Sequence, residues 1–185
     1  MSATSISTST IPAGVFDIDP AHSNVGFEVR HMGIATVRGT FRTFEGKLDA
    51  SGDAPVLQGS VATDSIDTGE ENRDGHLKSP EFFDAAAHPQ ISFRSTGTED
   101  AGEGQIRLVG EITIKGISKP IELTGTIAEN GQDPWGKERV GLEVEGKIDR
   151  RDFDLKWNQT LPNGNLLVSN DVKLLVSVSA VKSDQ

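Results

Sequence analysis

One spacing recurs six times along the chain: an apolar residue, any residue, glycine, any residue, and a second apolar residue. In a β-strand, residues i, i+2 and i+4 point to one face of the sheet, so each glycine shares a face with two bulky neighbours. The intervening positions are polar, with the exception of Val109. The six repeats span 37–41, 44–48, 57–61, 108–112, 123–127 and 144–148. They predict a sheet with a polar outer face and an apolar inner face from which bulk is missing at intervals.

Two interpretations of these glycines compete. A glycine in a strand often marks a bulge or a corner where the sheet bends. Six of them on the apolar face instead favour a partly empty interior. A rigid dry void costs roughly 24 cal/mol per Å³, and whole-domain stability is only about 5–15 kcal/mol. A large void is therefore expected to collapse, to fill with water or to hold an apolar ligand, and a Gly110→Leu substitution is expected to fill it.

Period-2 alternation predicts the fold class, an all-β protein with eight or nine antiparallel strands joined by short connections. The predicted strands are one beginning at Phe16, then 24–31, 34–48, 56–66, 90–97, 105–115, 120–129, 138–149 and 171–181. About eight strands close a barrel that is just wide enough for side chains or one ligand. A β-sandwich is the alternative. The long strands and the inward-facing glycines favour the eight-stranded antiparallel barrel.

One segment breaks the strand pattern and predicts a short helical insertion near residues 68–87. Asp67 and Thr68 are suitable capping residues for a first helical turn. Ser79-Pro80 is a second start signal, with proline at the first helical position. The insertion is expected to act as a lid, with Phe82 and Phe83 closing one mouth of the barrel.

Length and composition bound the remaining possibilities. The 185 residues predict a polar, disordered tail over 1–14 and a single barrel domain over 15–182. A net charge of -10 argues against sequence-independent nucleic-acid binding, and the absence of cysteine excludes disulfides and thiolate metal sites. No run is long enough for an integral membrane segment, and no secretory signal is recognisable, so the expected localisation is cytoplasmic. No motif predicts a cofactor or a metal.

The densest polar cluster surrounds Arg73, Asp74 and His76, and it has three interpretations. It can be a structural network at a helix end, a head-group site at the barrel mouth, or the acid–base set of a hydrolase or isomerase that uses His76 with Asp74. His31 alternates with Val25, Phe27 and Val29 and is expected to point inward, either as a structural residue or as a ligand contact.

The residues expected to contact an apolar chain are the inward-facing strand positions and the mouth. They are Phe27, Val29, His31, Phe41, Phe44, Arg73, His76, Phe82, Phe83, Phe93, Ile112, Leu123, Leu142 and Trp157. Burial contributes roughly 0.8 kcal/mol per CH₂ group. A barrel with a filled interior that acts as an interaction protein is the third reading, beside the binding module and the enzyme.

Several ordered motifs resemble those of YceI-like proteins. They are Asp19-Pro-Ala-His22-Ser23 with Phe27 and His31, Val37-Arg-Gly39-Thr-Phe41, Arg73-Asp74-Gly-His76-Leu77, Ser79-Pro-Glu-Phe82-Phe83, Leu108-Val-Gly-Glu-Ile112 and Asp149-Arg150-Arg-Asp-Phe153 with Trp157. The resemblance covers about residues 15–182. It implies a lipocalin-like barrel that binds a long isoprenoid lipid or an isoprenoid quinone, and it implies a homodimer. Many relatives are exported, in contrast to the localisation expected from this sequence.

Overall fold

The computed structural model describes residues 11–128 and 130–184. Within them the chain forms twelve strands, one α-helix and three short 3-10 helices. The strands are β1 (Val15–Ile18), β2 (Asn24–His31), β3 (Ala35–Phe41), β4 (Phe44–Asp49), β5 (Val56–Ala62), β6 (Ile66–Asp67), β7 (Gln90–Gly102), β8 (Gln105–Ile114), β9 (Ile117–Ile127), β10 (Gly131–Gln132), β11 (Glu138–Asp149) and β12 (Val168–Lys182). The helices are η1 (Pro20–His22), η2 (Thr63–Ser65), α1 (Glu71–Lys78) and η3 (Arg150–Phe153).

The strands close into an eight-stranded antiparallel barrel, and the prediction from alternation is confirmed. The order along the sheet runs β11-β9-β8-β7-β5-β4-β1-β12, and pairing of β11 with β12 closes the ring. Three of the eight barrel strands are interrupted: η1 separates β1 from β2, residues 42–43 separate β3 from β4, and η2 separates β5 from β6. At these breaks the sheet bends, so that β2 pairs with β12 and β3 pairs with β2, beyond the ring of β1 and β4.

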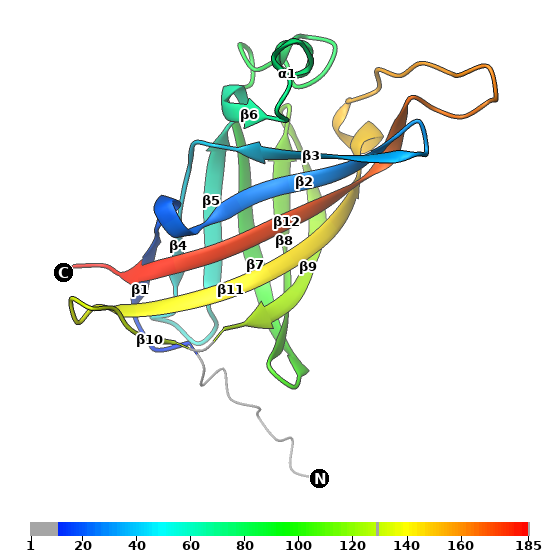
Figure 1. The fold of residues 1–185 in the computed structure, drawn as a ribbon. Coiled ribbons are helices and arrows are strands. Elements are labelled where there is room, and N and C mark those ends of the chain that lie inside the picture. Colours follow the sequence, from blue (N-terminus) through cyan, green and yellow to red (C-terminus); the bar gives the residue numbers. More distant parts are fainter. Residues whose placement is uncertain (1–10, 129, 185) are drawn as a thin grey trace.

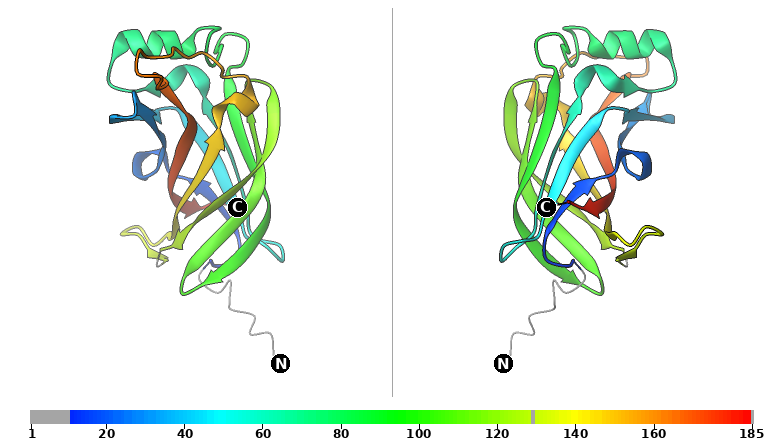
Figure 2. Two further views of the ribbon diagram at one scale, coloured as in Figure 1. Left: turned by 90° about the vertical axis from the view of Figure 1, so that its right-hand side faces the viewer. Right: turned by 90° about the vertical axis from the view of Figure 1, so that its left-hand side faces the viewer.

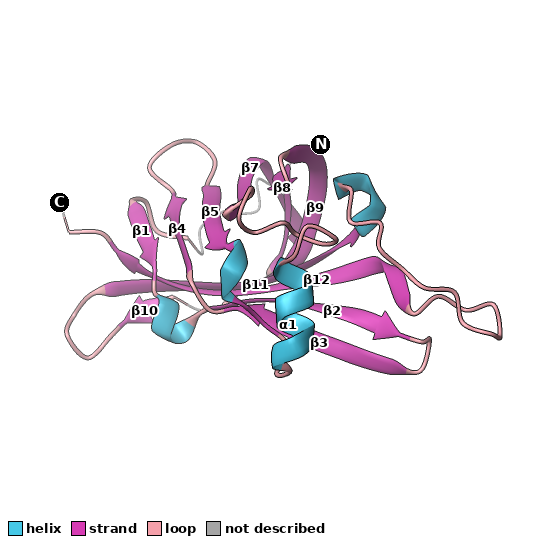
Figure 3. Cartoon of the chain, turned by 90° about the horizontal axis from the view of Figure 1, so that it is seen from above, coloured by secondary structure: helices cyan, strands magenta, loops and turns pink. Residues whose placement is uncertain are grey.

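The bend gives the barrel two layers and two unlike ends. In Figure 1, β3, β2, β12 and β11 cross the front, while β4, β5, β7, β8 and β9 run more steeply behind them. The helix α1 lies over one end, and the β7–β8 turn lies at the other, as the side views also show (Figure 2). Figure 3 looks onto the α1 end. The insertion therefore covers one mouth of the barrel.

The alternation of the sequence maps directly onto burial. In β8 the inward residues Ile106, Leu108, Gly110, Ile112 and Ile114 are buried, and the residues that alternate with them are more exposed. The predicted hairpin turn after β2 also forms. Met32 and Gly33 lie at positive φ in the centre of a turn in which the Ile34 N–H donates to the carbonyl of His31, and His31 pairs with Ala35 across it.

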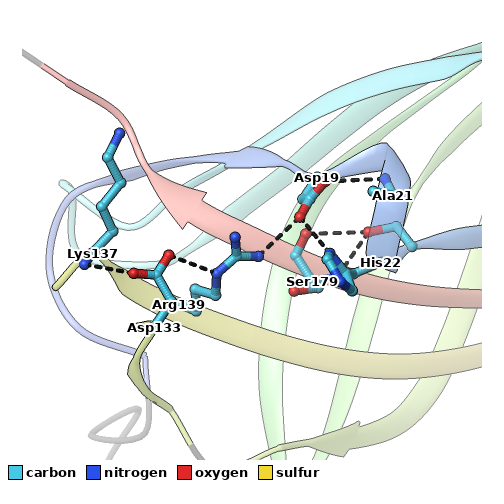
Figure 4. Close-up of polar contacts among 8 residues, drawn as sticks. Asp19, Ala21, His22, Asp133, Lys137, Arg139 and Ser179 are labelled. Atoms are coloured by element: carbon cyan, nitrogen blue, oxygen red, sulfur yellow. Dashed lines mark hydrogen bonds and ion pairs between the residues drawn. The ribbon is translucent and has the colours of Figure 1, made fainter. Parts of the chain in front are cut away.

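A polar network holds the break between β1 and β2 (Figure 4). The Asp19 carboxylate accepts hydrogen bonds from the Ala21 backbone N–H, from His22 Nδ1 at 2.7 Å and from Arg139 at 2.9 Å. Arg139 also donates to Asp133, in the turn before β11, at 3.0 Å. These hydrogen bonds hold the pKa of Asp19 at about 2, with His22 the largest cause and Arg139 the next. The network ties the bent first strand to the opposite edge of the β11–β12 pair.

The insertion contains one short helix, not two helical starts. The side chain of Glu70, rather than Asp67 or Thr68, caps α1 by accepting from the backbone N–H groups of Asn72 and Arg73. Ser79 ends the helix as its C-cap, and its hydroxyl donates to the carbonyl of His76. Residues 80–87 form turns, because the chain reverses at this point to place Phe82 and Phe83 over the barrel.

The repeated glycines do not enlarge the interior; they allow neighbouring groups to come close. A Cβ at Gly110 would lie 2.5 Å from the carbonyl oxygen of Arg94 and 2.8 Å from the ring of Phe93. A Cβ at Gly125 would lie 1.7 Å from the carbonyl oxygen of Glu143. The backbone of neighbouring strands and nearby aromatic rings therefore occupy the space that the missing side chains leave. A leucine at Gly110 would clash with the backbone before it filled any cavity.

The start of the described chain is packed against the barrel. The predicted tail over 1–14 lies mostly outside the described residues, and its last residues, 11–14, lie against the barrel. Ile11 is 8% exposed within the core, and Gly14 exchanges two backbone hydrogen bonds with Ala50. Among the described residues, no helix has the length and apolar character needed to cross a bilayer.

Candidate functional site: an apolar cavity under an aromatic lid

The barrel contains an apolar cavity of about 200 Å³ toward the α1 end. Its walls come from both layers of the barrel. The front wall includes Val172, Leu174 and Val176 of β12, and the back wall includes Ile91 and Phe93 of β7. The other end of the interior is packed solid around Phe16, Leu48 and Leu108, so the cavity occupies only part of the barrel.

Two aromatic clusters from the insertion close the α1 end. Phe83 meets the Phe41 ring edge-on at 6.2 Å, and Phe41 lies 5.8 Å from Phe27, so a row of rings runs from the lid into the cavity wall. The second cluster consists of His76, Phe82 and Trp157. Edge-on contacts of 5.0 Å and 4.9 Å join His76 to Phe82 and Trp157. Aromatic pairs of this kind contribute about 0.5–1.5 kcal/mol each beyond area burial.

The polar residues of the insertion bond within the lid. Arg73 donates to the side-chain and backbone oxygens of Thr68 at 2.7 and 2.8 Å. The Asp74 carboxylate accepts from the hydroxyl and the backbone N–H of Thr68. His76 Nε2 contacts the Glu81 carboxylate. Asp74 and His76 are therefore each engaged by a different partner, and the arrangement has the form of a helix-end network.

Nine of the fourteen predicted contact residues line the cavity. They are Phe27, Val29, Phe41, Phe44, Phe82, Phe83, Phe93, Ile112 and Leu123. The other five do not appear in its lining. Arg73, His76 and Trp157 belong to the lid and the adjoining loop, His31 lies at the end of β2, and Leu142 is part of the packed core.

Sequence reasoning missed the β12 wall and Arg150. Both carried a readable signal. The alternating positions of β12 continue through Val172, Leu174 and Val176, which is the inner face. In β11 the inward parity of Val144 and Ile148 extends to Arg150, so the same period places an arginine on the inner face at the strand end.

Arg150 is 3% exposed and lines the cavity. Its Nε donates to the carbonyl of Ser169 at 2.9 Å, and Nη1 donates to the carbonyls of Leu155 and Trp157. Burial lowers the pKa of Arg150, although arginine stays protonated in proteins. These bonds fasten the long loop between η3 and β12 to the barrel wall.

The fold and the cavity define the chain as a small up-and-down barrel that encloses an apolar site. The chain belongs to the YceI-like family, because the model of the YceI-like domain matches residues 16–180. It is 34% identical over 169 residues to protein YceI of Salmonella arizonae, which covers 90% of this chain and 85% of that protein.

Solved structures show the same fold. A YceI protein of Campylobacter jejuni superposes with a TM-score of 0.72 and 29% identity, covering 90% of this chain and 96% of that one. A polyisoprenoid-binding domain from Saccharophagus degradans, implicated in plant cell wall breakdown, superposes with a TM-score of 0.71 and 13% identity, covering 91% and 98% of the two chains.

Proposed function

We propose that this protein binds an isoprenoid chain, carried by a lipid or a quinone, in the apolar cavity of its barrel. The observation that carries the proposal is the cavity itself, about 200 Å³ of apolar space beneath a lid of aromatic side chains. At roughly 24 cal/mol per Å³, leaving that space dry costs on the order of 5 kcal/mol, which an apolar occupant would recover. The polyisoprenoid-binding domain with the same fold supports this class of ligand.

The alternatives have less support. A filled barrel would leave no apolar space, in contrast to the cavity described above. Catalysis by His76 with Asp74 requires the two side chains to act together, whereas they bond to Glu81 and Thr68. A homodimer and a cytoplasmic localisation stay predictions.

Extraction of the purified protein with organic solvent, followed by mass spectrometry, tests the proposal. A stoichiometric isoprenoid in the extract is the expected result. A clean extract calls for titration with a prenyl ligand, and failure of the folded protein to bind any prenyl chain would contradict the proposal.

A matched pair of variants shows whether the ligand occupies this cavity. Val172→Phe adds a ring to the lining, while Val181→Phe makes the same change on the same strand, outside the cavity lining. The first variant is expected to lose binding and the second to keep it, with both barrels folded by circular dichroism. Equal binding by both variants would place the ligand elsewhere.

A further inference from the structure

The wall of the cavity contains one cation that the apolar ligand does not explain. Arg150 lies at the end of β11, two residues after the lining residue Ile148, and its own side chain is part of the lining. An apolar chain alone gains nothing from a charge in the wall, and burying a charge is costly. The position of Arg150 therefore needs an account beyond hydrophobic binding.

Arg150 has a structural role in anchoring the loop that follows η3. The guanidinium has five N–H donors. Three of them donate to the carbonyls of Ser169, Leu155 and Trp157. Nη2 makes one long contact, of 3.5 Å, to the carbonyl of Val168. Among the described residues, this leaves the second N–H of Nη2 without a partner.

In the described part of the chain, Arg150 forms no direct ion pair, and the carboxylate that acts on its charge is that of the preceding residue, Asp149. The neighbouring carboxylate, Asp149, is occupied by Arg151, which donates to it through Nη2 at 2.6 Å and through Nε at 3.0 Å. Those bonds hold the pKa of Asp149 at about 2, so this carboxylate is ionised and already paired with Arg151. The hydrogen-bond partners of Arg150 are neutral carbonyls, so no carboxylate contacts its guanidinium directly among the described residues.

The carbonyl partners also place the guanidinium beside the ligand space. Leu155 and Val168 both line the cavity and both offer their carbonyl oxygens to Arg150. The spare donor and the positive charge are thus at an apolar surface, where a hydrogen bond to a charged group is worth more than in water. A ligand atom reaching this point would meet a donor and a positive charge.

We propose that Arg150 anchors the polar end of the ligand and selects a head group that presents a hydrogen-bond acceptor oxygen, either a carbonyl or an oxyanion. This inference rests on the proposed function, because it places the head of the same isoprenoid chain. A protonated amine at this point would be repelled, and a pure hydrocarbon would leave the donor unsatisfied. The head group then lies inside the barrel near η3, and the prenyl tail extends along the apolar walls.

Four probes with comparable short prenyl tails test the inference by calorimetric titration at pH 8. They are the hydrocarbon myrcene, the ketone geranylacetone, the carboxylate geranic acid and the cation geranylamine. The wild-type protein is expected to bind geranic acid, which has as many carbons as myrcene, at least about tenfold more tightly than myrcene, the size of a net hydrogen bond to a charged group. Geranylamine is expected to bind most weakly. Geranylacetone is larger by three carbons, worth roughly 0.8 kcal/mol each, and after this allowance the better of the ketone and the carboxylate identifies a carbonyl or an oxyanion as the head group.

Two variants separate recognition from loop anchoring. Arg150→Gln removes the charge and the spare donor but can still donate to two carbonyls. Arg151→Gln is the matched control, because it removes the same charge from the neighbouring residue, which is exposed and lies outside the cavity lining. The first is expected to bring the affinity ratio of geranic acid to myrcene close to one while myrcene still binds, and the second is expected to keep the wild-type ratio.

Three results would overturn the inference. Equal affinity of the wild type for myrcene and for both oxygenated probes would leave the proposed function without a head-group site. Loss of myrcene and geranylacetone by the same factor in Arg150→Gln would make Arg150 a loop anchor only. If no probe binds to the folded wild type, the proposed function fails as well. If Arg150→Gln does not fold, the wild-type series decides alone.

Discussion

Glycines on the inner face of this barrel meet two different kinds of neighbour. At Gly39 a Cβ would lie 2.3 Å from the ring of Phe27, a side chain that can turn aside. At Gly125 it would lie 1.7 Å from the carbonyl oxygen of Glu143, which the sheet holds in place. The first contact covers the glycine with a ring, and the second lets two strands cross closely. The cost of a side chain therefore depends on which neighbour has to move.

We expect Gly125→Ala to destabilise the barrel by at least about 1–3 kcal/mol, the usual range for overpacking, because its contact is with backbone. Gly97→Ala is the control. It lies in β7 with nothing within 4 Å of its Cβ, so its effect is expected to stay within about 0.5 kcal/mol. Urea unfolding of the two variants measures the difference. Equal midpoints would show that close approach at Gly125 does not constrain the fold.

Single residues also show where the sequence was sufficient and where it was not. Alternation predicted part of the cavity lining, because the parity of Phe27, Phe93 or Ile112 fixes the face of each side chain. The same alternation places Arg150 on the inner face, but a charged residue is ordinarily expected on the outer face. Whether the space beside Gly110 is filled depends on how closely two strands approach and on the orientation of the Phe93 ring. The local sequence pattern predicts neither.

At the scale of elements, the broken first strand depends on one carboxylate. Asp19 caps η1 and joins it to Arg139 of β11, and its side chain is only partly exposed. Its pKa of about 2 lies below the ordinary 3.8, because the folded state favours the ionised form. The stabilisation it gives is therefore full above the ordinary pKa and is lost as the pH falls from there through about 2.

We expect Asp19→Asn to lower the melting temperature at pH 7 and to flatten its decline between pH 5 and pH 2. Part of the decline in melting temperature is expected to remain in the variant, because Asp149, whose pKa is also about 2, is still present. Asp53→Asn, in the exposed β4–β5 loop, is the control for a lost carboxylate. Melting curves across this pH range test the idea, and a slope in Asp19→Asn as steep as in the wild type would refute it.

The lid is held largely by rings. No residue of Glu71–Lys78 is fully buried, although Leu77 packs against the core, whereas Phe82 is 7% exposed and packs against both His76 of this helix and Trp157. The sequence predicted a lid with Phe82 and Phe83 because an apolar pair stood in a polar insertion. It could not predict which turn would carry them, since Ser79 can begin one helix or end another, and tertiary packing of the rings decides between them.

We expect Phe82→Ala to cost about 3–5 kcal/mol if the lid fails to collapse, and less if His76 and Trp157 close over the gap. Ligand release is expected to become faster, because this ring closes one end of the cavity. Trp157 reports on the site in a Trp135→Phe background, since Trp135 is 81% exposed and far from the lid cluster in sequence. Stopped-flow fluorescence of a bound prenyl ketone measures the release rate. An unchanged rate would mean that ligands leave by another route.

At the scale of the whole molecule, the volume of the cavity limits what the barrel can hold without rearrangement. An engineered protein cavity of about 150 Å³ accepts benzene, with six carbons. By that proportion, about 200 Å³ accepts about eight carbons, or between one and two isoprene units. A long isoprenoid chain therefore needs space that this conformation fills with side chains. The row of rings Phe27, Phe41 and Phe83 borders that space and is joined to the lid.

We expect a series of prenyl ketones to show this limit as a change in kinetics. Ketones with tails of up to about two isoprene units are expected to enter at rates proportional to their concentration. Longer chains are expected to reach a maximum rate that is independent of concentration, because opening of the rings then precedes full entry. Each added CH₂ that finds a place still contributes roughly 0.8 kcal/mol before the cost of moving the rings. Affinity is therefore expected to rise again with length once the barrel has opened. Proportional rates for every chain length would mean that the space for a long chain already exists in the free protein.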